Sequence, residues 1–164
     1  MENEDMKQRR IQVGVIGGRE AAQHVLADAY QVGLLIARKG AVLFCGGLGG
    51  VMSAACEGAK EAFGLTVGIL PMDSSDPANP FVDIVVPSGL GVARNAVLIN
   101  ASDGVIAIGG KFGTLSEMAF ALQREIPVVS LHSWNVDPAV LVAETPADAV
   151  RILFEQIDRN MVYQ

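Results

Sequence analysis

Three glycine-rich turns contain the residues whose types and spacing could do chemistry. They are Gly17-Gly18, Gly46-Gly47-Leu48-Gly49-Gly50 and Gly109-Gly110-Lys111-Phe112-Gly113, and each follows a short apolar run. Closely spaced glycines let several backbone N–H groups point into one concavity, and a helix that follows adds the positive end of its dipole. Such turns can bind phosphate without basic side chains. Any one of them alone can equally be a short structural turn.

The third turn is the predicted phosphate cradle, and the second turn is predicted to line the neighbouring wall. The cradle consists of backbone N–H groups and one hydroxyl, from Gly109, Gly110, Gly113 and Thr114. The wall consists of Gly47, Gly49 and Gly50. A phosphate ligand is therefore expected at the start of the helix that follows the third turn.

Two charged residues, Arg94 and Glu117, can complete such a site. Arg94 can pair with phosphate or with charge on a leaving group, and Glu117 can steady a ribose hydroxyl or an oxocarbenium-like centre. Each also has a structural interpretation. Thr114-Leu-Ser-Glu117 is the pattern of a capping box, and Arg94 can be a solvated cation on a helix surface. Both interpretations stay open on residue types alone.

Other familiar sites are excluded by spacing. The glycine turns lack the six-residue dinucleotide fingerprint, and no Gly-Lys-Ser/Thr follows them as in a Walker phosphate loop. His24 and His132 have no partners at metal-ligand spacing, so no metal site is expected. Cys45 and Cys56 lie among apolar or small residues and are expected to be reduced core thiols.

The elements that position these turns alternate along the chain. Apolar, β-branched runs predict strands, and helical spacing or helix-end signals predict the segments between them as helices. The strands are expected at 11–16, 41–45, 65–70, 83–87, 104–108 and 127–131, and the helices at 21–39, 51–63, 91–100, 114–124 and after Thr145-Pro146. This order predicts an α/β fold, a single-domain Rossmann-like three-layer sandwich with a mainly parallel sheet and helices on both faces. All three glycine turns then lie at the carboxyl edge of the sheet, where such folds bind ligands.

Length and composition limit the possible classes of function. The chain has 164 residues, 51% of them hydrophobic, which indicates one globular domain over 11–164, preceded by a flexible polar tail at 1–10. Its net charge is −6. The acidic balance argues against nucleic acid or an anionic membrane as partner. No stretch reaches the roughly 18 apolar residues of a membrane span, and the start of the chain has no apolar signal region. A cytoplasmic protein is therefore expected.

The segment Gly109-Gly-Lys-Phe-Gly-Thr-Leu-Ser-Glu117 closely resembles the PGGxGTxxE motif of the LONELY GUY and lysine-decarboxylase-like superfamily. The resemblance extends to Gly46-Gly-Leu-Gly-Gly-Val-Met52 and to Arg94-Asn95. The nearest branch is that of the molybdenum cofactor carrier proteins, because Ala93-Arg94-Asn95 and a GGxxGTLSE turn occur together. The LONELY GUY enzymes instead have lysine after the arginine and proline before the turn, where this chain has Asn95 and Ile108.

This resemblance implies a binding protein for a phosphate-bearing, nucleotide-like or pterin-type small molecule. It requires no cofactor for itself, and its expected ligand is the molybdenum cofactor or a nucleoside monophosphate. The alternative is a nucleoside 5'-monophosphate phosphoribohydrolase of LONELY GUY type, with Arg94 and Glu117 as catalytic residues and hydrolysis weakened by Asn95. The resemblance also implies a homodimer or homotetramer, with helices 91–100 and 114–122 as the contact. The predicted ligand-binding residues are Gly17, Gly18, Gly46, Gly47, Gly49, Gly50, Arg94, Asn95, Gly109, Gly110, Gly113, Thr114 and Glu117.

Overall fold

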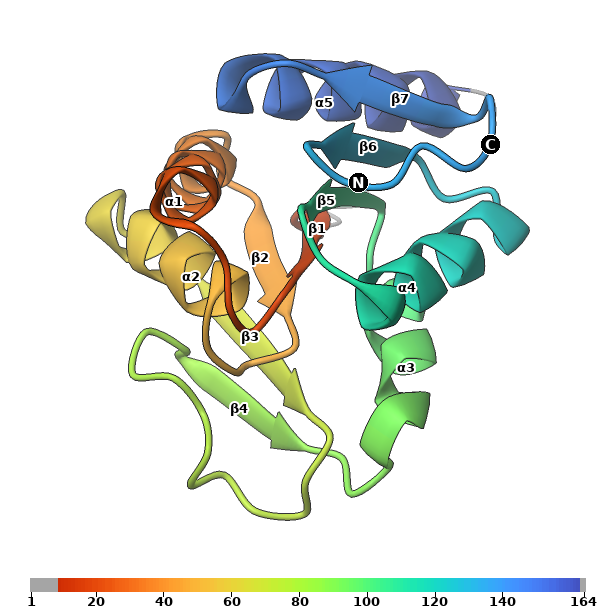
Figure 1. Cartoon of the computed structure of the whole chain (residues 1–164). Helices are drawn as coiled ribbons and strands as arrows, with labels where there is room; N and C mark the ends of the chain where they lie inside the picture. Colours follow the sequence, from red (N-terminus) through yellow and green to blue (C-terminus); the bar gives the residue numbers. More distant parts are fainter. Residues whose placement is uncertain (1–8, 163–164) are drawn as a thin grey trace, which may run out of the picture.

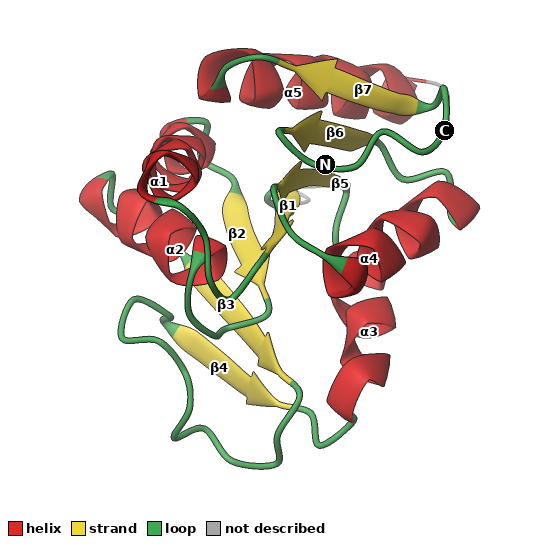
Figure 2. Cartoon of the chain, viewed as in Figure 1, coloured by secondary structure: helices red, strands yellow, loops and turns green. Residues whose placement is uncertain are grey.

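A computed structural model describes residues 9–162 of the chain, and the predicted tail at 1–10 lies mostly outside this range. The elements follow one another as β1 (Gln12–Gly17), α1 (Gln23–Arg38), β2 (Val42–Cys45), α2 (Val51–Glu61), β3 (Thr66–Leu70), β4 (Ile84–Pro87), the 3-10 turn η1 (Gly91–Ala93), α3 (Arg94–Asn100), β5 (Gly104–Ile108), α4 (Phe112–Gln123), β6 (Val128–Leu131), β7 (Val140–Ala143) and α5 (Pro146–Val162). Figure 1 follows the chain from β1 in red to α5 in blue, and Figure 2 separates helices from strands. The predicted α/β class is confirmed.

All strands of the seven-stranded sheet are parallel, in the order β4-β3-β2-β1-β5-β6-β7. The chain builds outward from β1 to β4 on one side and then returns to place β5 on the other side of β1. The strand order therefore reverses between β1 and β5. In open α/β sheets, this reversal opens a crevice outside the carboxyl ends of the two strands.

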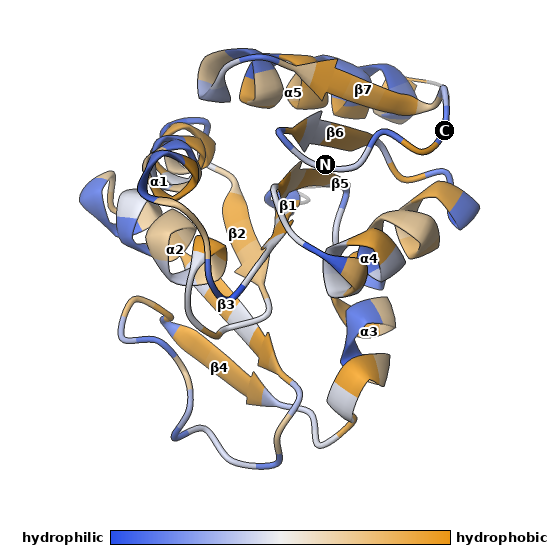
Figure 3. Cartoon of the chain, in the orientation of Figure 1, coloured by the Kyte–Doolittle hydropathy of each residue, from blue (hydrophilic) through white to orange (hydrophobic). Residues whose placement is uncertain are grey.

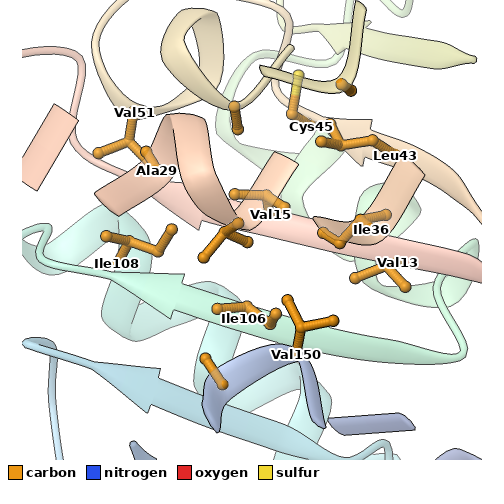
Figure 4. Packing of buried hydrophobic residues seen from close by; sticks show 14 of the residues in the cluster. Val13, Val15, Ala29, Ile36, Leu43, Cys45, Val51, Ile106, Ile108 and Val150 are labelled. Atoms are coloured by element: carbon orange, nitrogen blue, oxygen red, sulfur yellow. The ribbon is translucent and has the colours of Figure 1, made fainter. Parts of the chain in front are cut away.

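Helices cover both faces of the sheet. On one face α1 packs against both α2 and α5, and on the other face α3 packs against α4 (Figure 1). Alternate residues of each central strand serve the two layers: Val13 and Val15 of β1 pack under α1, whereas Ile16 packs with α3 and α4. Figure 4 shows the first of these cores, with Ile36 of α1 above Val13 and Val150 of α5 beside Ile106.

The sheet centre is apolar because helices cover it on both faces. All five residues of β3 and all five of β5 are buried, and Figure 3 shows the strands as predominantly hydrophobic. The outer strands β4 and β7 are partly exposed. Continuous apolar runs of this kind are typical of parallel strands, which explains why the strand prediction from residue types succeeded.

The structure corrects three local predictions. The segment Val140–Ala143 is an edge strand that was not predicted, since four residues beside a turn give little period-two signal. The predicted helix at 91–100 begins with a 3-10 turn, and its α-helical part starts only at Arg94. The predicted helix at 114–124 begins two residues earlier, at Phe112. The last difference changes the role of Glu117.

The predicted cap of the last helix is confirmed. The Asp148 backbone N–H donates to Thr145 Oγ1 at 3.1 Å, and Pro146 is the first helical residue. Thr145 therefore satisfies one of the backbone donors that the first turn of a helix leaves without a partner.

Candidate ligand-binding site

A cavity of about 710 Å³ opens at the point where the strand order reverses. Its floor and walls come from the end of β1, the turns that follow β1 and β5, the start of α1, and residues of α3 and α4. Its size lies within the roughly 300–1,000 Å³ of small-molecule sites. The position is the one that the alternating strands and helices predict for a ligand.

Two helices begin at this cavity without a side-chain cap. The N-cap residues are Ala22 for α1 and Lys111 for α4, neither makes a side-chain capping bond within the described range, and neither helix has an acidic residue in its first turn. Ala22 and Lys111 both line the cavity. Uncapped helix N-termini present free N–H donors and a partial positive charge, so together they favour an anion.

The third glycine turn is held in shape by the segment that follows β6. Ser133 Oγ donates to the Gly109 carbonyl at 2.5 Å, and Trp134 Nε1 donates to the Lys111 carbonyl at 3.2 Å. Gly109 and Gly110 both have positive φ angles, of 55° and 91°, a conformation that favours glycine. Two carbonyl groups of the turn are thus bonded to Ser133 and Trp134. The Gly109 N–H donates to the Leu131 carbonyl at 3.3 Å, so this member of the predicted cradle is already bonded, and the remaining donors are the N–H groups at the start of α4.

Arg94 is the main cation of the cavity wall. Only 7% of the residue is exposed, and its Nε and Nη1 atoms are buried with no hydrogen-bond partner among the described residues. Burial lowers the pKa of Arg94 most, Glu117 opposes that shift, and Arg19 adds to it. The alternative of a solvated surface cation is therefore wrong. A buried guanidinium with unused donors is costly unless an anion pairs with it.

Gly46 makes room for this guanidinium. A Cβ atom at Gly46 would lie 2.7 Å from Nη2 and 2.8 Å from Cζ of Arg94. These separations are closer than nonbonded atoms allow, because carbon contacts are optimal near 3.5–4.0 Å. A glycine is thus required at the end of β2 for Arg94 to lie where it does.

Glu117 faces the same cavity from the second turn of α4. It is 7% exposed, and burial raises its pKa to about 7, although the charge of Arg94 works in the opposite direction. The capping-box interpretation is wrong, because α4 begins at Phe112 and Thr114 is already its third residue. Glu117 is then too far along the helix to reach the cap. The structure brings Glu117 and Arg94 together from two helices.

Asn95 lines the cavity and also joins α3 to α4. Its Nδ2 donates to Ser116 Oγ at 3.1 Å, and Ser116 Oγ donates to the Gly113 carbonyl at 2.7 Å. The Asn95 amide therefore helps to hold the third glycine turn, through Ser116 and the Gly113 carbonyl. It supplies no positive charge at the place where the LONELY GUY enzymes have lysine.

Ten of the thirteen residues predicted to bind the ligand line this one cavity. They are Gly17, Gly18, Gly46, Arg94, Asn95, Gly109, Gly110, Gly113, Thr114 and Glu117. The remaining three, Gly47, Gly49 and Gly50, are absent from its lining.

Two of these three glycines instead have a packing role. Gly50 has a φ of 65° and packs against the backbone of Gly18 and Arg19, and the Val51 N–H donates to the Gly18 carbonyl at 3.0 Å. Gly47, with a φ of 75°, packs against Gly68 of β3. The second turn therefore holds the first turn in place, which glycine spacing alone cannot distinguish from ligand contact.

Sequence reasoning missed Arg19 and Glu20, which line the cavity from the turn after β1. Their only signal is their position directly after Gly17-Gly18. The cysteines match their prediction: Cys45 and Cys56 are free and buried, with their Sγ atoms 3.5 Å apart. Over residues 9–162 no cluster of three or more His, Cys, Asp or Glu residues could hold a metal ion. The described helices include none with the length and apolar character needed to cross a membrane.

Fold and site together define a Rossmann-like α/β protein whose crevice, at the reversal of strand order, is lined by a buried arginine and two uncapped helix N-termini. Residues 10–160 match the model of the SLOG cluster4 family, and the chain belongs to this family of the LONELY GUY and lysine-decarboxylase-like superfamily. An uncharacterized protein of Archaeoglobus fulgidus is 46% identical over 140 residues, which cover 85% of this chain and 92% of that protein.

Two solved structures share the whole fold. The molybdenum cofactor binding protein of Rippkaea orientalis is 39% identical, with a TM-score of 0.87 over 92% of this chain and 99% of its own. The molybdenum cofactor carrier protein of Chlamydomonas reinhardtii is 35% identical, with a TM-score of 0.83 over 91% and 98%. The chain is therefore similar to molybdenum cofactor carriers in both sequence and structure.

Proposed function

We propose that this protein binds and carries a phosphate-bearing pterin-type molecule, with the molybdenum cofactor as the ligand. The observation that carries the proposal is Arg94, a buried guanidinium with two unpartnered nitrogens in a cavity bounded by two uncapped helix N-termini. The two helix N-termini and the cations Arg94, Arg19 and Lys111 favour an anion, and they outnumber the two carboxyl groups of the lining, Glu20 and Glu117. The similarity to a molybdenum cofactor binding protein and to a molybdenum cofactor carrier protein supports the choice of ligand.

The cavity suits both parts of such a ligand. The N–H groups at the start of α4 and the Arg94 guanidinium are donors for a phosphate group. Glu117 and Asn95 offer polar atoms on the same wall, and hydrogen bonding to the edge of a planar heterocycle needs groups of this kind. Val15, Ile16 and Val25 add apolar surface. A few polar groups in an otherwise apolar pocket are typical of small-molecule sites.

The test is retention of the cofactor. The purified protein is incubated anaerobically with molybdenum cofactor released from a molybdenum enzyme and then passed through a desalting column. Molybdenum and oxidised pterin are measured in the protein fraction. We expect both to co-elute with the wild type in a fixed ratio, and elution of both with the small molecules would contradict the proposal.

Gly113→Asp is the matched disruptive variant. A Cβ atom at Gly113 meets nothing within 4 Å, so the side chain fits the ligand-free fold and adds a negative charge to the cavity. We expect retention to fall at least about tenfold, because a carboxylate in the cavity repels the phosphate of the ligand. Gly113→Asn has nearly the same shape without the charge and should retain more cofactor. Equal retention by the two variants would show that charge is not what the site selects.

A second function, hydrolysis of nucleoside 5'-monophosphates, is favoured by one observation. Arg94 and Glu117 lie on the same cavity wall, and a carboxyl group with a pKa of about 7 is suited to proton transfer at neutral pH. Asn95, however, supplies no second positive charge. A charge-assisted contact contributes roughly 1.5–3 kcal/mol, so its absence costs about tenfold to a hundredfold in rate.

The assay that separates the two functions follows release of free base from AMP. We expect weak or no turnover by the wild type, together with retention of the molybdenum cofactor. Glu117→Gln is the control for a catalytic carboxylate. Robust turnover that collapses in Glu117→Gln would favour the hydrolase over the carrier.

A further inference from the structure

Arg19 lines the cavity, and neither the family motif nor the fold supplies a role for its charge. It stands in the turn between β1 and α1, directly after Gly17-Gly18, and its side chain is exposed at the cavity. No ion pair to Arg19 occurs within residues 9–162, although Glu20 is its neighbour in sequence. Its charge therefore has no structural partner in the described part of the chain.

The turn that carries Arg19 is fixed rather than free. Gly50 packs against the Arg19 carbonyl group, and the Val51 N–H holds the Gly18 carbonyl at 3.0 Å. The start of α2 thus sets the path of the backbone at Arg19. Ligand binding therefore has to order only the side chain of Arg19, because the backbone that carries it is already fixed.

Arg19 also approaches Arg94 closely enough to disfavour its charge. The positive charge of Arg19 contributes to the lowered pKa of Arg94, after the larger effect of burial. Two guanidinium groups facing one cavity repel each other, and Arg94 already has two nitrogens without a partner. An anion between them removes the repulsion and fills the empty donor positions.

We infer that Arg19 and Arg94 form a two-arginine seat for a phosphate monoester dianion of the ligand. This inference rests on the proposed function and adds the group that the site selects, a terminal phosphate rather than a diester or a neutral ring. A phosphate monoester carries close to two negative charges at neutral pH, which two guanidinium groups match. Each guanidinium presents parallel N–H donors that fit two phosphate oxygens. Arg19 is thus a specificity-determining residue.

The inference is tested first with inorganic phosphate, measured by thermal stabilisation of the ligand-free protein at constant ionic strength. A ligand that binds only the folded state stabilises it in proportion to the logarithm of its concentration over Kd. We expect Arg19→Gln to raise the apparent Kd for phosphate about tenfold. Arg38→Gln is the matched control, since it makes the same charge change at an exposed arginine at the other end of α1. It should leave the Kd unchanged.

A second set of measurements distinguishes a ligand's phosphate from free phosphate. The binding of AMP and of adenosine is measured by calorimetry for the wild type and for Arg19→Gln. The substitution should weaken the binding of AMP about tenfold and leave the binding of adenosine unchanged. Equal loss for both compounds, or for neither, would overturn the inference. So would a wild type that inorganic phosphate does not stabilise.

Cofactor retention keeps this inference separate from the proposed function. If the wild type retains the molybdenum cofactor but Arg19→Gln does so equally well, the carrier function stands and the two-arginine seat is wrong. If the wild type retains no cofactor but phosphate and AMP binding both depend on Arg19, the seat stands and the identity of the cargo is wrong.

Discussion

Gly46→Ala is the substitution whose effects on ligand binding and on stability the structure predicts most specifically. The new Cβ atom would meet Arg94 Nη1 first and would lie 2.7 Å from Nη2 and 2.8 Å from Cζ. Gly46 is not among the glycines with positive φ, so alanine is compatible with the backbone. Because the atoms in the way form the end of a long side chain, the guanidinium moves and the turn stays. The substitution therefore displaces Arg94 without replacing it.

The expected effect on binding follows from the contacts that Arg94 would make. Hydrogen bonds to a charged group contribute roughly 1.5–3 kcal/mol, so their loss weakens the Kd for phosphate about tenfold to a hundredfold. The effect on the ligand-free protein has the opposite sign. Moving a buried, unpartnered guanidinium into water removes a cost, and alanine restricts the unfolded chain by about 0.4–1 kcal/mol more than glycine. The free energy of unfolding should stay equal or rise by about 1 kcal/mol.

Two measurements check these opposite effects. Urea unfolding gives the stability of the ligand-free protein, and thermal stabilisation by inorganic phosphate gives the apparent Kd. Gly49→Ala is the matched control in the same turn, because its Cβ atom would make only an ordinary 3.7 Å contact with the Arg19 carbonyl. Binding by Gly46→Ala as tight as that of Gly49→Ala would refute the role of Arg94. A fall of more than about 2 kcal/mol in unfolding free energy would refute the argument that only the guanidinium moves.

Three further expectations address electrostatics, assembly and dynamics. Burial raises the pKa of Glu117 from 4.5 to about 7, so the folded state binds this proton more tightly than the unfolded state. Its stabilising contribution is complete below pH 4.5 and is lost as pH rises through 7; unfolding free energy should fall by up to about 3 kcal/mol over that range, and a pH series on Glu117→Gln should lack this component. Val92, Val97 and Phe120, on η1, α3 and α4, are exposed apolar residues, and we expect sedimentation to show a homo-oligomer; a 17.2 kDa monomer at micromolar concentration would contradict this. The loop at 71–80 should exchange amide hydrogens faster than β5, and equal protection would show that it is not a local opening unit.

The sequence by itself determined the class of fold and the edge of the sheet at which the cavity lies. Continuous apolar runs marked the strands because both faces of a parallel sheet are buried, and the signals for helix ends lie within a few residues of each end. Since all strands of a parallel sheet point in the same direction, the glycine turns that follow them must lie at the same edge. Arg94 and Glu117 came from the family motif, and the structure shows both lining the cavity.

The tertiary structure decided what each of these residues does. Whether Glu117 caps a helix or faces a cavity depends on where α4 begins, and the segment after β6 holds that turn through Ser133 and Trp134. Whether Arg94 is solvated or buried depends on its fit over Gly46, a residue 48 positions away in the chain. The same holds for Gly50, which supports the first turn, and for Arg19, which that turn brings to the cavity. The burial of Arg94 and Glu117, the repulsion between Arg94 and Arg19, and the unused donors of Arg94 all depend on contacts between distant segments of the chain. Local residue patterns do not predict those contacts.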